Sequence, residues 1–131
     1  LDFSFSGLKT AVALEAAKPG DRAALAAGFQ EAVVEALAAR ARAALKATRA
    51  RTLVLAGGVA ANGAVRERFA ALAREAGVRL VVPALPLCTD NAAMIACAGW
   101  YAARRGRRSP LNAPVRPDWN AGAPLGAAGV A

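Results

Sequence analysis

A glycine-rich turn and a single carboxylate are the residues of this chain best placed to do chemistry. Gly57 and Gly58 follow a short apolar run, and a helix is expected to begin near Ala64, after Asn62. Glycines let backbone N–H groups approach an anion closely, and a helix start adds partial positive charge. Asp90 follows the next apolar run, at the start of another expected helix. Together the two turns predict a divided site for a phosphate compound and a cation.

Each of these residues also has a plainer structural explanation. Many turns carry paired glycines for their backbone geometry alone. The Asn62 amide could contact a ribose or adenine edge, or it could cap the following helix. A carboxylate at Asp90 could satisfy free N–H groups at a helix start, which stabilises by about 1 kcal/mol. A metal would need at least two further ligands, and the residues alone supply no obvious ones.

Two further polar groups are weaker candidates. Ser6 and Lys9 flank Gly7 at the first expected strand-to-helix turn, where a hydroxyl and an ammonium could hold an anion. Strand alternation explains the serine equally well. Cys88 could be a soft metal ligand, although a buried inert thiol is the simpler explanation.

Composition limits the classes of function that this chain can perform. Its 131 residues include 17 basic and 9 acidic side chains, a net charge of +8, and no histidine. The charge favours a polyanion such as RNA, unless an acidic remainder of a longer protein balances it. Without histidine, the segment can complete neither a Ser-His-Asp nor a Cys-His arrangement, and it has no His metal ligand.

The cellular setting follows from the same composition. No apolar run approaches the roughly 20 residues of a membrane span, and no signal peptide is visible. The spacing of the two cysteines is unlike a zinc pairing, which indicates reduced thiols. We therefore expect a cytoplasmic protein with no membrane association.

Hydrophobic periodicity predicts an α/β architecture, because strands and helices alternate along the chain. The uninterrupted apolar run at 52–56 is typical of a strand covered on both faces. Asp21 is expected to cap a long helix, and Gly77 to end a later one. The expected strands are 1–6, 52–56 and 78–82, and the expected helices are 8–17, 21–48, 64–76 and 91–104.

The predicted domain organisation is a core over 1–105 followed by a Pro- and Gly-rich tail over 106–131. Within the core, the helix over 91–104 is expected to turn Met94, Ile95, Ala98 and Tyr101 inward. The chain begins at Leu1 inside what reads as structured sequence, so we expect a piece of a longer polypeptide. Such a piece is expected to self-associate through exposed core near the first strand.

Three segments, taken together, carry a family resemblance. FSFSGLKT at 3–10, LAGGVAAN at 55–62 and LCTDNAAMIA at 87–96 resemble the C-terminal part of the tRNA adenosine threonylcarbamoyltransferase (TsaD) family, formerly known as O-sialoglycoprotein endopeptidases or glycoproteases. The resemblance implies an actin-like ATPase lobe of RNase H-like topology, with a mixed sheet and flanking helices, from a two-lobed protein. It also implies transfer of a threonylcarbamoyl group from threonylcarbamoyl-adenylate to N6 of adenosine 37 in tRNAs reading ANN codons.

Residue roles follow from the resemblance position by position. Asn62 matches a nucleotide-contacting asparagine, and Gly57 and Gly58 match the glycine turn beside an adenylate or ATP-type nucleotide. Asp90 matches the carboxylate that binds one divalent metal, iron or zinc. The other metal ligands are two histidines of a His-x-x-x-His motif, which this chain lacks, so the chain alone is expected to be inactive. The implied partners are tRNA and other subunits of the threonylcarbamoyladenosine machinery.

Two other functions compete with this interpretation. A lobe of another actin-like phosphotransferase, such as a sugar or acetate kinase, would share the glycine turn but leave the Cys-Thr-Asp-Asn cluster unexplained. A noncatalytic module that pairs with the transferase should lack the combination of Asp90 and Asn62, and both are present.

Overall fold

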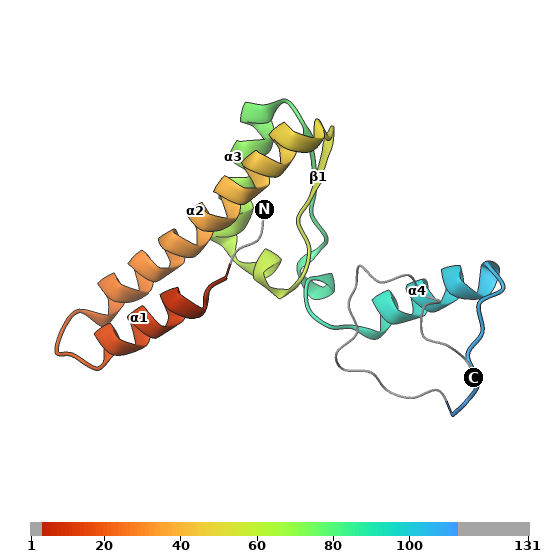
Figure 1. Cartoon of the computed structure of the whole chain (residues 1–131), viewed down its shortest axis with the longest axis horizontal. Coiled ribbons are helices and arrows are strands. Elements are labelled where there is room, and N and C mark those ends of the chain that lie inside the picture. Colours follow the sequence, from red (N-terminus) through yellow and green to blue (C-terminus); the bar gives the residue numbers. More distant parts are fainter. Residues whose placement is uncertain (1–3, 113–131) are drawn as a thin grey trace. The chain divides into compact units, whose positions relative to one another are not determined.

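The computed structural model of the chain describes residues 4–112, which form α-helices, two short 3₁₀ helices and two short strands (Figure 1). By compactness the chain divides into two units, Leu1–Met94 and Ile95–Ala131. The elements, in chain order, are α1 (Ser6–Ala16), α2 (Arg22–Thr48), β1 (Thr52–Val54), the short 3₁₀ helix η1 (Gly58–Ala61), α3 (Gly63–Ala76), β2 (Arg79–Val81), a second 3₁₀ helix η2 (Leu85–Leu87) and α4 (Ala92–Arg104).

Local capping chemistry sets the boundaries of the central helices. The Asp21 side chain accepts hydrogen bonds from the backbone N–H groups of Ala23 and Ala24, at 2.8 and 3.2 Å, which confirms it as the cap of α2. Gly77 ends α3 in the left-handed region at φ 64°, as predicted. Arg49 ends α2 in the same region, at φ 54°, although it is not a glycine.

Strands β1 and β2 run parallel and adjacent, with Leu53 opposite Leu80. A parallel pair needs a crossover connection, and α3 supplies it. Helices α2 and α3 lie side by side (Figure 1). Leu53 and Leu80 pack against the core that these two helices form with the sheet. The buried members of that core are Val34, Ala38, Leu55, Ala60, Val65, Phe69 and Cys88.

The sheet differs from the predicted one in three respects. It is a two-stranded parallel sheet in the described residues, where a mixed sheet was expected. Residues 4 and 5 are in no strand and Ser6 begins α1, so the strand predicted over 1–6 is wrong for residues 4–6, and residues 1–3 lie outside the described part. Val54, on the strand face away from Leu53, is 63% exposed, because the described chain covers only one face of the sheet.

Helix α4 also differs from expectation, because none of its residues is buried. Met94, Ile95 and Tyr101, which were predicted to point inward, are 48%, 66% and 53% exposed. Trp100 packs edge-on against Tyr101, and the Arg104 guanidinium lies 4.8 Å from the centre of the Trp100 ring. The tail predicted beyond 106 lies mostly outside the described residues.

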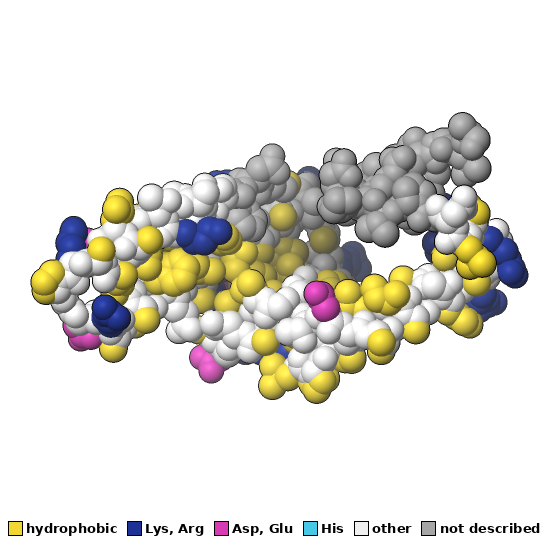
Figure 2. Space-filling model, turned by 90° about the horizontal axis from the view of Figure 1, so that it is seen from below, with side chains coloured by type: hydrophobic (Ala, Val, Ile, Leu, Met, Phe, Trp, Pro, Cys, Tyr) yellow, Lys and Arg dark blue, Asp and Glu magenta, His cyan; other side chains and the backbone are white. Residues whose placement is uncertain are grey.

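Hydrophobic side chains reach the surface at many places on the face seen in Figure 2. Large hydrophobic side chains are exposed in the described residues, among them Leu14 and Leu85 of the first unit. None of the helices in residues 4–112 combines the length and the apolar character needed to cross a membrane.

Candidate functional site

Both predicted turns leave the same edge of the sheet. Gly57 and η1 follow the carboxyl end of β1, and the segment leading to Asp90 follows the carboxyl end of β2. Ligands of open α/β sheets bind outside the carboxyl ends of their parallel strands. The fold therefore places the glycine turn and the carboxylate on neighbouring connections.

The glycine turn has a conformation that depends on its first residue. Gly57 has φ 88° and ψ 174°, a combination that is almost restricted to glycine. Gly58 begins η1 and has no left-handed φ. A Cβ built on either residue would meet nothing within 4 Å, so the space in front of the turn is open.

Asn62 caps α3, which was one of its two predicted roles. Its side-chain oxygen accepts a hydrogen bond from the Val65 backbone N–H at 3.2 Å. Its amide nitrogen donates to the Gln30 side chain on α2 at 3.0 Å. One amide hydrogen and one oxygen lone pair are left over, and the residue is exposed. The cap therefore leaves the amide with the capacity to contact a nucleotide.

Asp90 does not perform the capping role that was its plainer explanation. Asn91 takes that role, because its side-chain oxygen accepts a hydrogen bond from the Met94 backbone N–H at 3.0 Å. The amide of Asn91 also donates to the Thr89 carbonyl at 2.8 Å. In residues 4–112 the exposed Asp90 carboxylate has neither a hydrogen-bond partner nor an ion-pair partner. It is left available for a ligand.

Arg66 joins the two connections, and the sequence interpretation missed it. Its Nε donates to the carbonyl of the fully buried Ala60 in η1 at 2.5 Å. Its Nη2 lies 2.9 Å from the carbonyl oxygen of Pro83 and 3.1 Å from Sγ of Cys88, both on the connection after β2. One guanidinium therefore holds the glycine turn and the segment before Asp90 together.

A signal for Arg66 was present in the sequence. It lies three residues before Phe69 and four before Ala70, so it shares the inner face of α3 with partly or fully buried residues. A charged residue on such a face needs partners. Cys88 is 3% exposed, which agrees with the simpler of its two predicted roles.

In residues 4–112, the side chains of Ser6 and Lys9 form no hydrogen bond or ion pair with either turn. Ser6 shares hydrogen bonds with Ser4 and with Thr10, all within the start of α1. Lys9 is exposed on the same helix. Their predicted role in anion binding stays a prediction.

The described residues do not by themselves make a metal site. No group of three His, Cys, Asp or Glu side chains gathers anywhere in residues 4–112. Asp90 has the right chemistry for one ligand of a divalent cation, being an ionisable carboxylate with no competing partner. Residues 4–112 therefore contain no complete coordination sphere, and the metal-binding role of Asp90 stays a prediction.

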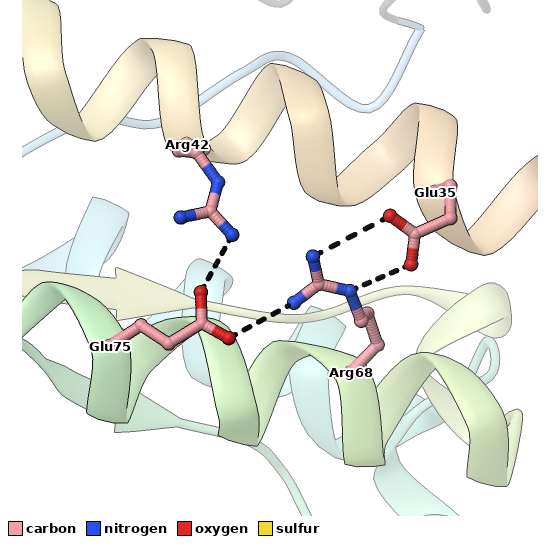
Figure 3. Close-up of polar contacts among 4 residues, drawn as sticks. All are labelled: Glu35, Arg42, Arg68 and Glu75. Carbon is pink, nitrogen blue, oxygen red and sulfur yellow. Dashed lines mark hydrogen bonds and ion pairs between the residues drawn. The ribbon is translucent and has the colours of Figure 1, made fainter.

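Ion pairs connect α2 with α3 (Figure 3). The Arg68 guanidinium lies 2.7 Å from Glu35 and 3.7 Å from Glu75, and Glu75 also accepts from Arg42 at 2.7 Å. The bond from Arg42 holds the pKa of Glu75 below its ordinary value. The bond to Glu35 raises the pKa of Arg68, which therefore stays charged.

The comparison with protein families covers both turns. Residues 1–97 match the family model described as TsaD, tRNA N6-adenosine threonylcarbamoyltransferase. The chain belongs to this family. The match confirms the resemblance carried by the three segments.

Individual relatives agree with the family match. The chain is 52% identical over 127 residues to the tRNA N6-adenosine threonylcarbamoyltransferase of Paracoccus denitrificans, covering 90% of this chain and 36% of that protein. The corresponding protein of Methylobacterium sp. is 48% identical over 138 residues, covering 98% and 40%. That of Symbiobacterium thermophilum is 49% identical over 126 residues, covering 92% and 37%. The chain thus spans well under half the length of these family members.

Proposed function

We propose that this chain forms one wall of the active site of a tRNA-modifying transferase. The complete enzyme moves a threonylcarbamoyl group from threonylcarbamoyl-adenylate to N6 of adenosine 37 in tRNAs that read ANN codons. The lobe belongs to an actin-like ATPase fold whose other lobe supplies the rest of the site. The reaction takes place in the cytoplasm, together with other subunits of the same machinery.

The observation that carries this proposal is that the Asp90 carboxylate, on the connection next to the glycine turn, has no partner in residues 4–112. Its connection and that of Gly57 leave one sheet edge and are tied by Arg66. A helix-capping role for Asp90 is taken by Asn91. A carboxylate held at such an edge without a structural task is well suited to a ligand.

The transfer is an acyl substitution with a simple balance. The adenine N6 attacks the carbamoyl carbon, a new C–N bond forms, and the bond from that carbon to the adenylate phosphate oxygen breaks. AMP leaves with the bonding electrons, and N6 loses one proton. Gly57 and Gly58 allow the backbone to approach the departing phosphate, and Asn62 contacts the nucleoside through the capacity that its cap leaves unused.

A divalent metal, iron or zinc, supplies Lewis-acid polarisation when it is bound. Asp90 is the ligand that this chain contributes, and histidines outside the chain complete the set. The carboxylate is exposed and has no partner among the described residues, so binding a cation would displace no existing contact.

The decisive experiment replaces Asp90 by Asn in the complete transferase. We expect metal content and threonylcarbamoyl transfer to fall together, while the melting temperature stays within about 1 °C, because an exposed side chain without partners contributes little stability. Glu31→Gln is the matched control, an exposed carboxylate on α2 expected to change nothing. Full metal stoichiometry and full activity in Asp90→Asn would refute the assignment.

A second variant separates the two roles of Asn62. Asn62→Ser keeps an oxygen that can cap α3, so unfolding should change little, whereas Asn62→Ala should cost about 1 kcal/mol. Both variants should weaken nucleotide binding equally if the amide contacts the nucleotide. Unchanged nucleotide affinity in Asn62→Ser would leave the cap as the only role.

The 131-residue chain alone is expected to form no threonylcarbamoyladenosine in the same assay. No group of three possible metal ligands gathers in residues 4–112, so a metal site would need ligands from elsewhere. Nucleoside analysis of tRNA after incubation measures the product directly, and its appearance would contradict the divided site.

A further inference from the structure

A basic hollow lies at the opposite edge of the sheet from the two turns. It is an open surface depression of about 400 Å³, where α2 and α3 end and the two strands begin. Four cations line it, and the rest of its lining is uncharged: Arg42, Lys46, Arg49 and Arg51. We call these four residues and the space between them the basic hollow.

Three of the four cations have no acidic partner among residues 4–112. In the described part of the chain, Lys46, Arg49 and Arg51 form no side-chain ion pair, and each is exposed. Arg42 is different, since Glu75 holds its guanidinium at 2.7 Å (Figure 3). Glu75 in turn is shared with Arg68 at 3.7 Å. The acidic side chains of this region are thus used between the helices, and none lines the hollow.

Helix dipoles account for only part of this charge. The carboxyl ends of α2 and α3 both lie at the hollow, capped by Arg49 and Gly77. Each helix end carries roughly half a negative charge, so the two together offset about one cation. Against three unpaired cations, a surplus of roughly two positive charges remains.

The lining favours a nucleic acid over a protein. The apolar side chains that line the hollow are small or medium in size, among them Leu45 and Val78, and no aromatic residue contributes. Protein interfaces build an apolar and aromatic core. A cluster of Lys and Arg on a polar surface is the usual partner of phosphates along an RNA backbone.

We infer that the basic hollow binds the phosphate backbone of tRNA, away from the nucleotide that is modified. The inference rests on the proposed function for the identity of the RNA. Strands of three residues separate the hollow from the turns, a distance of roughly 10 Å, and a folded RNA exceeds that span. The hollow would then set the affinity for tRNA without touching the reacting atoms.

The test removes the three unpaired cations in the complete transferase, with the triple variant Lys46→Gln, Arg49→Gly and Arg51→Gln. Glycine suits position 49, because the residue there has φ 54°. Binding of an unmodified tRNA transcript is measured at several salt concentrations. We expect at least a roughly tenfold loss of affinity near 0.1 M salt, and a salt-dependence slope smaller by about 3, one per lost phosphate contact.

The matched control removes three cations from the other basic group, with Arg105→Gln, Arg107→Gln and Arg108→Gln. It changes the net charge equally and should leave the slope close to that of the unchanged protein. The charge-conserving pair Lys46→Arg and Arg51→Lys should keep the affinity. Circular dichroism melting shows whether each variant folds. If the triple variant does not fold, the charge-conserving double variant still tests whether tRNA affinity follows the charge of the hollow.

The outcomes separate the inference from the proposed function. If the triple variant still transfers the group, with a raised KM for tRNA and an unchanged kcat, the result supports both the hollow and the proposed function. If the triple variant loses tRNA binding but the unchanged protein itself never transfers the group, the result supports the hollow and refutes the proposed function. An unchanged slope in an active enzyme refutes the hollow alone, as does an equal loss in the control. Unchanged tRNA binding with loss of a partner subunit would make the hollow a protein interface and overturn the inference.

Discussion

At the scale of single residues, backbone conformation and hydrogen-bond partners distinguish side chains that look alike in the sequence. Gly57 and Gly58 are neighbours, and both face open space, yet only Gly57 has a left-handed φ. Asp90 and Asn91 are neighbours as well, yet only Asn91 caps α4. In each pair only one residue has the structural role: Gly57 adopts the positive φ of the turn, and Asn91 caps the helix.

The two glycines provide a test with an internal control. Gly57→Ala should destabilise the chain by about 1–3 kcal/mol, because alanine is strained at φ 88° and ψ 174°. Gly58→Ala should change the free energy of unfolding by less than about 0.5 kcal/mol, as at an ordinary surface position. Urea unfolding measures both values. Equal losses would show that packing, and not backbone strain, restricts this turn.

Arg66 is predicted to stabilise the fold by linking the connection after β1 to the connection after β2. Arg66→Ala should cost roughly 1–3 kcal/mol, because the carbonyl of the buried Ala60 and that of Pro83 both lose a charged donor. The Cys88 thiol, now 3% exposed, should react faster with an alkylating reagent.

Two variants sharpen the Arg66 test. Arg66→Lys should recover only part of the stability, because an ammonium cannot reproduce the planar guanidinium fork. Glu67→Ala, at the exposed neighbouring position, should be nearly neutral. Unchanged thiol reactivity in Arg66→Ala would argue against a link between the two connections through Arg66.

At the scale of elements, α2 and α3 are held together by an apolar core and by the exposed ion pairs on its border. Val34 and Ala38 of α2 are buried against Val65 and Phe69 of α3. The ion pairs of Glu35 and Glu75 lie outside that core, where salt and water weaken them. Burial therefore supplies most of the helix–helix stability, and the ion pairs adjust it.

The lowered pKa of Glu75 predicts an acid-dependent contribution with a definite sign. Its stabilisation is present above the pKa of the unfolded chain and is lost as the pH falls through the lower pKa of the folded chain. Glu75→Gln should thus have a lower urea midpoint than the unchanged chain at neutral pH. The two midpoints should converge on the acid side of the ordinary glutamate range.

Two observations control this prediction. Arg68, whose pKa is raised, stays charged throughout that pH range and adds no pH dependence of its own. Glu31→Gln, at an exposed position of α2, should show no such convergence. High salt should reduce the neutral-pH difference for Glu75→Gln, and a difference that persists at low pH would contradict the ion-pair origin.

At the scale of the whole molecule, the described chain leaves much apolar surface uncovered. Val54 on β1 is 63% exposed, Ile95 on α4 is 66% exposed, and many other hydrophobic side chains reach the surface (Figure 2). The family relatives are much longer, since this chain covers 36% to 40% of the length of two of them. The remainder of such a protein is a natural cover for these surfaces.

We expect the 131-residue chain on its own to self-associate because of these surfaces. Light scattering over a dilution series should show a mass above that of the monomer, falling as the chain is diluted. Val54→Thr keeps a β-branched side chain while reducing apolar exposure, and it should shift the series toward monomer. A clean monomer at all concentrations would remove the expectation.

The sequence by itself determined the features that depend on neighbouring residues. The Asp21 cap, the Gly77 stop and the order of helices and strands from α2 to α4 follow from local backbone preferences and periodicity, and the structure confirms them. The family could be recognised for a similar reason, because its motifs are short and contiguous.

Only the tertiary structure decided which side chains meet across the chain. Arg66 contacts Cys88, 22 positions away, and neither residue signals the other in sequence. The sequence also did not show that Asp90 has no partner in residues 4–112. Nor did it show that α4 is exposed, because its apolar periodicity predicted burial. Periodicity shows which face of a helix is apolar, but burial needs a covering surface, and that surface is a property of the assembled fold.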